Sequence, residues 1–121
     1  MPDKAFIVDD HFDTADTMRS ALTFAGYDAE AFTSFEECLK RITHESPCIL
    51  FMDYHTPGPM NPLVFLSLVQ SKFPHLKIVV VSADNRIRDK VNHLGAKFIL
   101  KPVDLDQIQL MCAQHCSSHG K

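Results

Sequence analysis

No apolar run in this sequence approaches the ~20 residues that a membrane-spanning helix needs. The first residues, Met-Pro-Asp-Lys, include an acid and precede only a short apolar stretch, so a secretory signal is not expected. An excess of basic residues is missing too, because 12 Lys and Arg stand against 15 Asp and Glu, a net charge of -3. We therefore expect neither a membrane span nor direct nucleic-acid binding.

What is present is an ordinary globular composition, with 45% hydrophobic and 22% charged residues. This composition excludes a disordered chain, a coiled coil and a collagen-like fibre. Repeats, linkers and low-complexity tracts are absent. The length of 121 residues predicts one domain over 1–121, without a separate effector domain.

The chain has four cysteines, Cys38, Cys48, Cys112 and Cys116. Without a secretory signal we expect all four to be reduced thiols in the cytoplasm, and Cys38 and Cys48 to be small core residues. Cys112, Cys116 and His119 have helical spacing and could bind zinc. A structural zinc site usually needs four ligands, so packing of Cys112 into the core is the favoured interpretation.

Alternating apolar runs and helical patterns predict five strands and five helices. The strands are expected at residues 4–8, 27–32, 48–52, 77–82 and 98–100. The helices are expected at residues 13–25, 34–42, 62–73, 86–94 and 105–116. Gly26 suits a helix end, while Ser34 and the Asn61-Pro62 pair suit helix starts. The alternation and the continuously apolar strands predict an α/β fold, a parallel sheet covered on both faces.

Polar residues follow the predicted strands at the points where the apolar runs stop. They are Asp9 and Asp10, Asp53, Ser82 and Lys101, at the ends of the first, third, fourth and fifth strands. Ligands of open parallel sheets bind beyond the carboxyl ends of the strands. If the sheet order places these strands together, the five side chains meet at one edge. Any one of them alone would be read as a helix cap or a solvated residue, but their joint occurrence favours a functional site.

Three clustered carboxylates repel one another unless a cation joins them. Hard oxygen ligands favour Mg²⁺, which commonly adds phosphate oxygens to its shell. One carboxylate can then act as a nucleophile toward a phosphoryl group, while Mg²⁺ and the lysine ammonium neutralise charge on the transferred oxygens. The serine hydroxyl can donate a hydrogen bond to one of those oxygens. The constellation predicts phosphoryl transfer to an aspartate, with Mg²⁺ as the cofactor.

Four segments carry a family resemblance, namely residues 6–10 (FIVDD), 50–53 followed by 57–58 (LFMD and PG), 79–83 (VVVSA) and 95–102 (GAKFILKP). In this order they resemble the receiver domain of two-component response regulators, and the resemblance extends over nearly the whole chain. It implies a flavodoxin-like, doubly wound five-stranded parallel sheet with five helices and strand order 2-1-3-4-5.

The resemblance also assigns the phosphoacceptor and its metal. Asp53 would accept the phosphoryl group, and Lys101 would pair with that group or with Asp53. Mg²⁺ would be bound directly by Asp10, Asp53 and the backbone carbonyl of His55. Asp9 would act mainly through a metal-bound water.

Two further residues would form the switch. Ser82 would move to hydrogen-bond a phosphoryl oxygen, and Phe98 would be the aromatic switch residue, buried in the active state and more exposed otherwise. The Lys101-Pro102 bond would be cis and would aim the lysine inward. The acyl phosphate would bias an equilibrium between two conformations and change the face formed by the last two helices and the fifth strand.

By the same resemblance, the phosphoryl group comes from a histidine kinase or a histidine phosphotransfer protein. The changed face then binds a downstream protein, an effector domain or a second copy of the chain. The protein would be a cytoplasmic signalling switch, with self-catalysed phosphotransfer and dephosphorylation but no metabolic enzyme activity.

The sequence departs from the family pattern beside the predicted site. Thr56 stands where a methionine is usual, and Pro62 stands where a glycine is usual, so the loop after the phosphoacceptor is expected to follow an altered path. The fourth helix is expected to be about one turn short. His55, Thr56 and Asp84 are rim positions, where His55 and Asp84 either position the attacking water or are merely solvated.

Two alternatives remain open at this point. A degenerate receiver would be an interaction module that takes up no phosphoryl group; the five site residues argue against it, and the changed loop keeps it open. An enzyme is the other alternative. An aspartate-nucleophile phosphatase needs a second acid where His55 stands, and a flavin protein needs a phosphate-binding loop where Asp9 and Asp10 would repel the phosphate.

Overall fold

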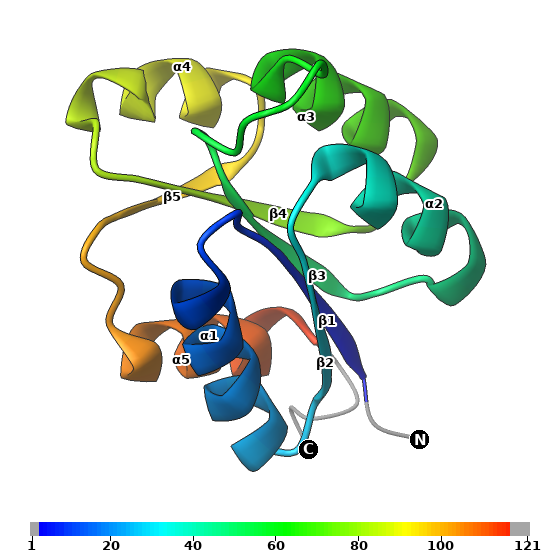
Figure 1. Ribbon diagram of the computed structural model, residues 1–121, viewed down its shortest axis with the longest axis vertical. Coiled ribbons are helices and arrows are strands. Elements are labelled where there is room, and N and C mark those ends of the chain that lie inside the picture. Colours follow the sequence, from blue (N-terminus) through cyan, green and yellow to red (C-terminus); the bar gives the residue numbers. More distant parts are fainter. Residues whose placement is uncertain (1–2, 117–121) are drawn as a thin grey trace.

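The computed structural model describes residues 3–116. The strands are β1 (Lys4–Val8), β2 (Asp28–Phe32), β3 (Ile49–Asp53), β4 (Lys77–Ser82) and β5 (Lys97–Leu100). The helices are α1 (Phe12–Phe24), α2 (Phe35–Glu45), α3 (Pro62–Lys72), α4 (Arg88–His93) and α5 (Leu105–His115), with a 3₁₀ turn η1 (Asn85–Ile87) before α4. α1 and α5 lie on one side of the sheet, and α2, α3 and α4 lie on the other (Figure 1).

The five strands are parallel and have the order β2-β1-β3-β4-β5, which confirms the predicted fold. The chain builds the sheet outward in one direction from β1 to β2 and in the other from β3 to β5. Ligands of such sheets bind in the crevice at this switch point. Asp9 follows β1 and Asp53 ends β3, so both acids stand at the switch point.

The three central strands β1, β3 and β4 are almost entirely apolar because the sheet has a core on each face, whereas the edge strands β2 and β5 are only partly buried. Alternate residues of one strand point to opposite faces. Phe51 therefore packs in the cluster under α1 and α5, while Leu50 and Met52 pack in the cluster under α2, α3 and α4. In the second cluster the ring of Phe35 stacks on that of Phe65, with centroids 4.6 Å apart.

Local signals set the ends of several helices as predicted. The Ser34 hydroxyl accepts the Glu37 N–H at the start of α2, and the Asn61 side chain accepts the Leu63 N–H at the start of α3. Gly26 has φ 101°, the positive value that a residue after a helix end needs. α4 has only six residues, which confirms the abbreviated fourth helix.

α2 runs to Glu45 instead of ending near Ile42. Its extra turn is polar, so hydrophobic spacing did not reveal it. Glu45 pairs with Arg41 one turn earlier and with Lys4 of β1 at 3.2 Å. Ion pairs along and beyond the helix therefore extend it, and the other element boundaries lie within one or two residues of the prediction.

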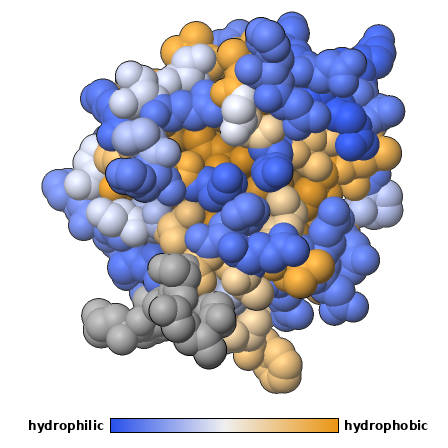
Figure 2. Space-filling model, turned by 180° about the vertical axis from the view of Figure 1, so that it is seen from behind, coloured by the Kyte–Doolittle hydropathy of each residue, from blue (hydrophilic) through white to orange (hydrophobic). Residues whose placement is uncertain are grey.

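The face of the molecule in Figure 2 is mostly hydrophilic, with hydrophobic residues showing near its middle. Among residues 3–116, no helix combines the length and apolarity required to cross a bilayer.

The prediction that all cysteines are free thiols is wrong for one pair. Cys48 and Cys116 form a disulfide, with their Cα atoms 5.6 Å apart, although the residues are 68 positions apart in sequence. The fold brings the two cysteines together, because the beginning of β3 and the end of α5 lie at the same end of the sheet. Cys116 is therefore not available for the zinc set that was considered, and His119 of that set lies outside the described residues.

The two remaining cysteines, Cys38 and Cys112, are free and buried, as expected for core residues. Burial raises the pKa of the Cys112 thiol to about 12 and also raises that of Cys38. Neither thiol ionises near neutral pH, so neither is a reactive nucleophile.

Candidate functional site

Strand register brings the predicted site residues to one edge of the sheet. Val8 pairs with Met52, so Asp9 follows β1 at the level of Asp53. Asp53 in turn pairs with Val81, the residue before Ser82. Ser82 pairs with Leu100, the residue before Lys101. Asp9, Asp53, Ser82 and Lys101 thus form one row across four neighbouring strands.

Lys101 is the cation of this row. Its Nζ lies 3.1 Å from Asp53 Oδ2 and 3.8 Å from Asp9 Oδ2. The two acids are 3% and 4% exposed, so their charges are poorly solvated. Burial raises the pKa of Asp9, and the nearby charge of Asp53 adds to this effect; the His11 N–H and the Lys101 ammonium oppose it. The ionised form of Asp9 is therefore stabilised by the Lys101 ammonium and the His11 N–H.

A metal ion fits the acidic end of the row. One ligand atom from each of Asp9, Asp10, His11 and Asp53 lies within 4.8 Å of the others. Asp10 Oδ1 is buried without a hydrogen-bond donor, although His11 Nδ1 stands 3.3 Å away. A carboxylate oxygen left without a donor beside two other carboxylates suits a hard divalent cation such as Mg²⁺. Which carboxylates would bind directly and which through water stays a prediction, as does the role of the His55 carbonyl.

The loop after β3 is tied to the phosphoacceptor position. The His55 N–H donates to Asp53 Oδ1 at 3.0 Å. Thr56 donates to the Asp53 carbonyl from both its N–H, at 3.2 Å, and its hydroxyl, at 2.9 Å. Thr56 is only 4% exposed, so it lies beneath the site instead of on its rim. Its hydroxyl stabilises the turn, a role that an apolar residue at this position could not fill.

Ser82 is fully buried, and its hydroxyl oxygen has two neighbours. It accepts the Asp84 N–H at 2.9 Å and lies 3.1 Å from His55 Nε2. The Asp84 carboxylate binds Arg86, whose side chain and N–H lower the pKa of Asp84. Asp84 therefore caps the 3₁₀ turn η1, while the His55 ring reaches into the site.

The predicted aromatic switch is half-buried and lies beneath a cation. Phe98 packs on the edge of the core under α4, and the guanidinium of Arg88 lies 4.8 Å from the centre of its ring. The Lys101-Pro102 peptide bond is cis, as the resemblance implied.

Two site contacts add to the predicted set. The His11 side chain is 69% exposed, yet its Nδ1 lies 3.3 Å from both Asp9 and Asp10. Its position next to the acidic pair was the available signal. The Arg88 contact with Phe98 had no sequence signal, because it depends on how the shortened α4 sits over β5.

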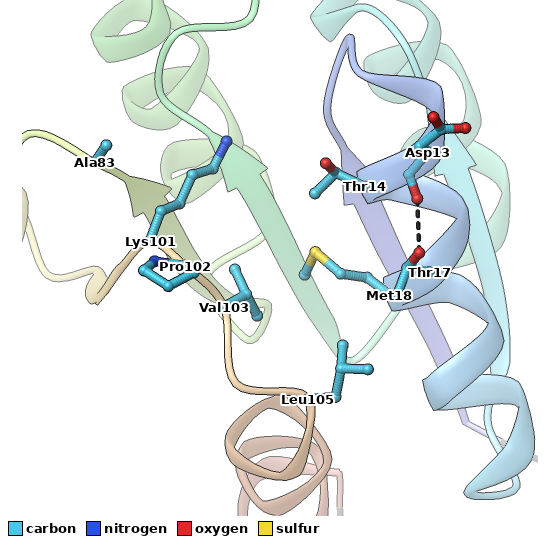
Figure 3. Close-up of a pocket in the computed structure, with 9 residues that line it drawn as sticks. All are labelled: Asp13, Thr14, Thr17, Met18, Ala83, Lys101, Pro102, Val103 and Leu105. Atoms are coloured by element: carbon cyan, nitrogen blue, oxygen red, sulfur yellow. Dashed lines mark hydrogen bonds between the residues drawn. The ribbon is translucent and has the colours of Figure 1, made fainter.

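A cavity of about 660 Å³ opens beside the site. Figure 3 shows Lys101 and Pro102 on one wall, with Thr14, Thr17 and Met18 of α1 opposite them. Lys101 belongs both to this cavity and to the row of charges around Asp53. The cavity therefore adjoins the lysine that pairs with Asp53, although Asp53 itself does not line it.

A family model described as the response regulator receiver domain matches residues 5–113. The chain belongs to this family. The receiver is 31% identical over 106 residues to the DNA-binding transcriptional regulator NtrC of Klebsiella pneumoniae, covering 85% of this chain and 22% of that protein. It is 23% identical over 118 residues to the response regulator protein FleR of Pseudomonas aeruginosa, covering 95% of this chain and 25% of that protein. The chain thus spans about a quarter or less of these relatives.

Solved structures show the same receiver fold. The NtrX receiver domain from Brucella abortus superposes with a TM-score of 0.85 at 24% identity, covering 94% of this chain and 98% of that one. A CheY-like receiver domain protein from Methanospirillum hungatei superposes with a TM-score of 0.87 at 23% identity, covering 99% and 98% of the two chains.

Proposed function

We propose that this receiver is a phosphoacceptor switch in which Asp53 takes a phosphoryl group from a phosphohistidine. The observation that supports this most is the position of the Asp53 carboxylate. It is almost buried, paired with Lys101 at 3.1 Å and adjacent to the carboxylates of Asp9 and Asp10. A degenerate receiver would have no use for this arrangement.

The transfer exchanges one bond for another. A carboxylate oxygen of Asp53 attacks phosphorus, the bond from phosphorus to the donor imidazole nitrogen breaks, and that nitrogen keeps the electron pair. Lys101 neutralises charge on the transferred oxygens, and the Ser82 hydroxyl donates a hydrogen bond to one of them. Mg²⁺, held by Asp10, Asp53 and Asp9, would supply further positive charge. This chain carries out no other reaction in the proposal.

Incubation with acetyl phosphate and Mg²⁺ tests the proposal. We expect the peptide containing Asp53 to gain one phosphoryl group, detected by mass spectrometry of the intact protein and its fragments. The gain should disappear in Asp53→Asn and when a chelator removes Mg²⁺. Absence of any modified Asp53 would instead support a phosphorylation-independent interaction module.

The partners are proposed at the level of their chemistry. The donor is a histidine kinase or a histidine phosphotransfer protein, and the output face consists of α4, β5 and α5. Leu94, Leu100 and Leu110 on or next to these elements are large exposed apolar residues, which suits a protein partner, an effector domain or a second copy of this receiver. We place this exchange in the cytoplasm.

We expect the donor protein to dock over the cavity beside Lys101. Thr17→Trp would fill the cavity from α1, and we expect it to slow phosphotransfer from the donor protein at least 10-fold. Uptake from acetyl phosphate, which is small, should stay within about twofold of the wild type. Thr23→Trp is the matched control, an exposed threonine of the same helix that does not line the cavity. Equal effects of both variants on the protein donor would contradict this docking path.

A further inference from the structure

The hydroxyl of Ser82 already has a side-chain neighbour before any phosphoryl group is present. Its oxygen lies 3.1 Å from His55 Nε2, and it also accepts the Asp84 N–H at 2.9 Å. The serine is fully buried whereas His55 is exposed, so their contact lies at the boundary between the core and solvent. The two contacts together define one position for the hydroxyl.

This position conflicts with the role of Ser82 in the proposed switch. A hydroxyl has a single proton and donates one hydrogen bond at a time. If that proton goes to His55 Nε2, it is not available to a phosphoryl oxygen on Asp53. If His55 is instead the donor, movement of Ser82 toward the phosphoryl group still breaks the contact. In either arrangement, activation requires the loss of this hydrogen bond.

The His55 ring is itself held in place. The backbone N–H of His55 donates to Asp53 Oδ1 at 3.0 Å. The imidazole also meets the Tyr54 ring edge to face, with centroids 5.3 Å apart and an interplanar angle of 80°. His55 is exposed, but its backbone is fixed by the bond to Asp53, and the ring contacts with Tyr54 and Ser82 define its orientation.

We propose that His55 retains Ser82 in the unphosphorylated arrangement and so opposes activation of the switch. The His55 imidazole acts here as a positioning group, because it contacts the Ser82 hydroxyl, while only the backbone N–H of His55 contacts the Asp53 carboxylate. This inference rests on the proposed function, since it concerns the regulation of the same site. To move Ser82, phosphorylation must then supply the free energy of the His55–Ser82 hydrogen bond.

Beryllofluoride, a mimic of the phosphoryl group, measures this opposition at equilibrium. With Mg²⁺ present, we expect His55→Phe to bind beryllofluoride roughly 2- to 10-fold more tightly than the wild type, the factor that one ordinary hydrogen bond represents. Phenylalanine keeps a ring against Tyr54 and removes the nitrogen. His55→Ala should change affinity in the same direction, which guards against a steric effect of the larger ring.

A double-mutant cycle identifies Ser82 as the target. In a Ser82→Ala background, His55→Phe should no longer change the affinity for beryllofluoride, because the contact is already lost. An equal gain in that background, or no gain in either His55 variant, would overturn the inference while leaving the proposed function intact. If the wild type binds no beryllofluoride, the proposed function itself is wrong and the inference falls with it.

Discussion

Lys101→Met should lower the rate of phosphoryl uptake by Asp53 about 100- to 1000-fold, the usual effect of removing one group that stabilises a developing oxyanion. Methionine keeps the length of the side chain and removes its charge. Lys101 Nζ lies 3.1 Å from Asp53 Oδ2, so the ammonium stands where the transferred oxygens would arrive. Single-turnover phosphorylation by acetyl phosphate, followed by mass spectrometry, measures the rate.

The same substitution should also destabilise the fold. It leaves two nearly buried carboxylates, Asp9 and Asp53, without their cation, and we expect a loss of roughly 1 to 3 kcal/mol in the free energy of unfolding. Solvent screening limits this loss because the Lys101 side chain is 25% exposed.

The loss should depend on pH in a definite direction. Burial already raises the pKa of Asp9, and removal of the Lys101 ammonium raises it further. A carboxyl with a raised folded-state pKa stabilises the protein at low pH, and this contribution is lost as the pH rises through that pKa. The deficit of Lys101→Met should therefore shrink on acidification, and urea titrations at several pH values measure it.

Lys97→Met serves as the control, since Lys97 is an exposed lysine of the same strand, β5. It should change neither the uptake rate nor the unfolding free energy by more than a small amount. If Lys97→Met and Lys101→Met behave alike, the pairing of Lys101 with the acids has no special importance.

Reduction of the Cys48–Cys116 disulfide should lower the free energy of unfolding by about 4 kcal/mol. The bond joins residues 68 positions apart. Closing a loop of that length in the unfolded chain removes entropy worth about 4 kcal/mol in the chain-entropy model. Urea denaturation with and without a thiol reductant measures the difference.

The double variant Cys48→Ser/Cys116→Ser is the matched control. It should resemble the reduced protein and should not respond to reductant. Phosphoryl uptake should be retained in both, because Cys48 precedes β3 while Asp53 stands at the opposite end of that strand. A wild type whose stability is unchanged by reductant would show that the bond is unimportant or absent in solution.

In a reducing cytoplasm we expect Cys48 and Cys116 to be thiols. The redox state of these two cysteines in the cell would therefore also indicate the compartment.

Sequence pattern predicted the fold well because its signals are local. Short strand-like segments between helical patterns predicted five strands, and the structure has all five. The caps at Ser34 and Asn61 were equally local, since each is a side chain that bonds a backbone N–H two or three residues away. The polar turn at the end of α2 was missed because part of its stabilisation comes from Lys4, which lies on strand β1.

The same distinction between local signals and contacts of separate elements applies to the candidate site. Asp9, Asp53, Ser82 and Lys101 could be named from the sequence because each directly ends or follows an apolar strand, and parallel register then places them in one row. The burial of Thr56 and the capping role of Asp84 were not predictable, since both depend on which way a loop turns after its strand.

By itself, the sequence determined the α/β class, the element order and the acids and lysine at the strand ends, because periodicity and strand termini are properties of short segments. Only the tertiary structure decided that Cys48 bonds to Cys116, that the His55 ring contacts Ser82 and that the Arg88 guanidinium lies over Phe98. Those contacts depend on distances between side chains of separate elements, which no local pattern encodes. The proposed chemistry could therefore be inferred from the sequence, whereas the contacts proposed to restrain it became visible only in the folded chain.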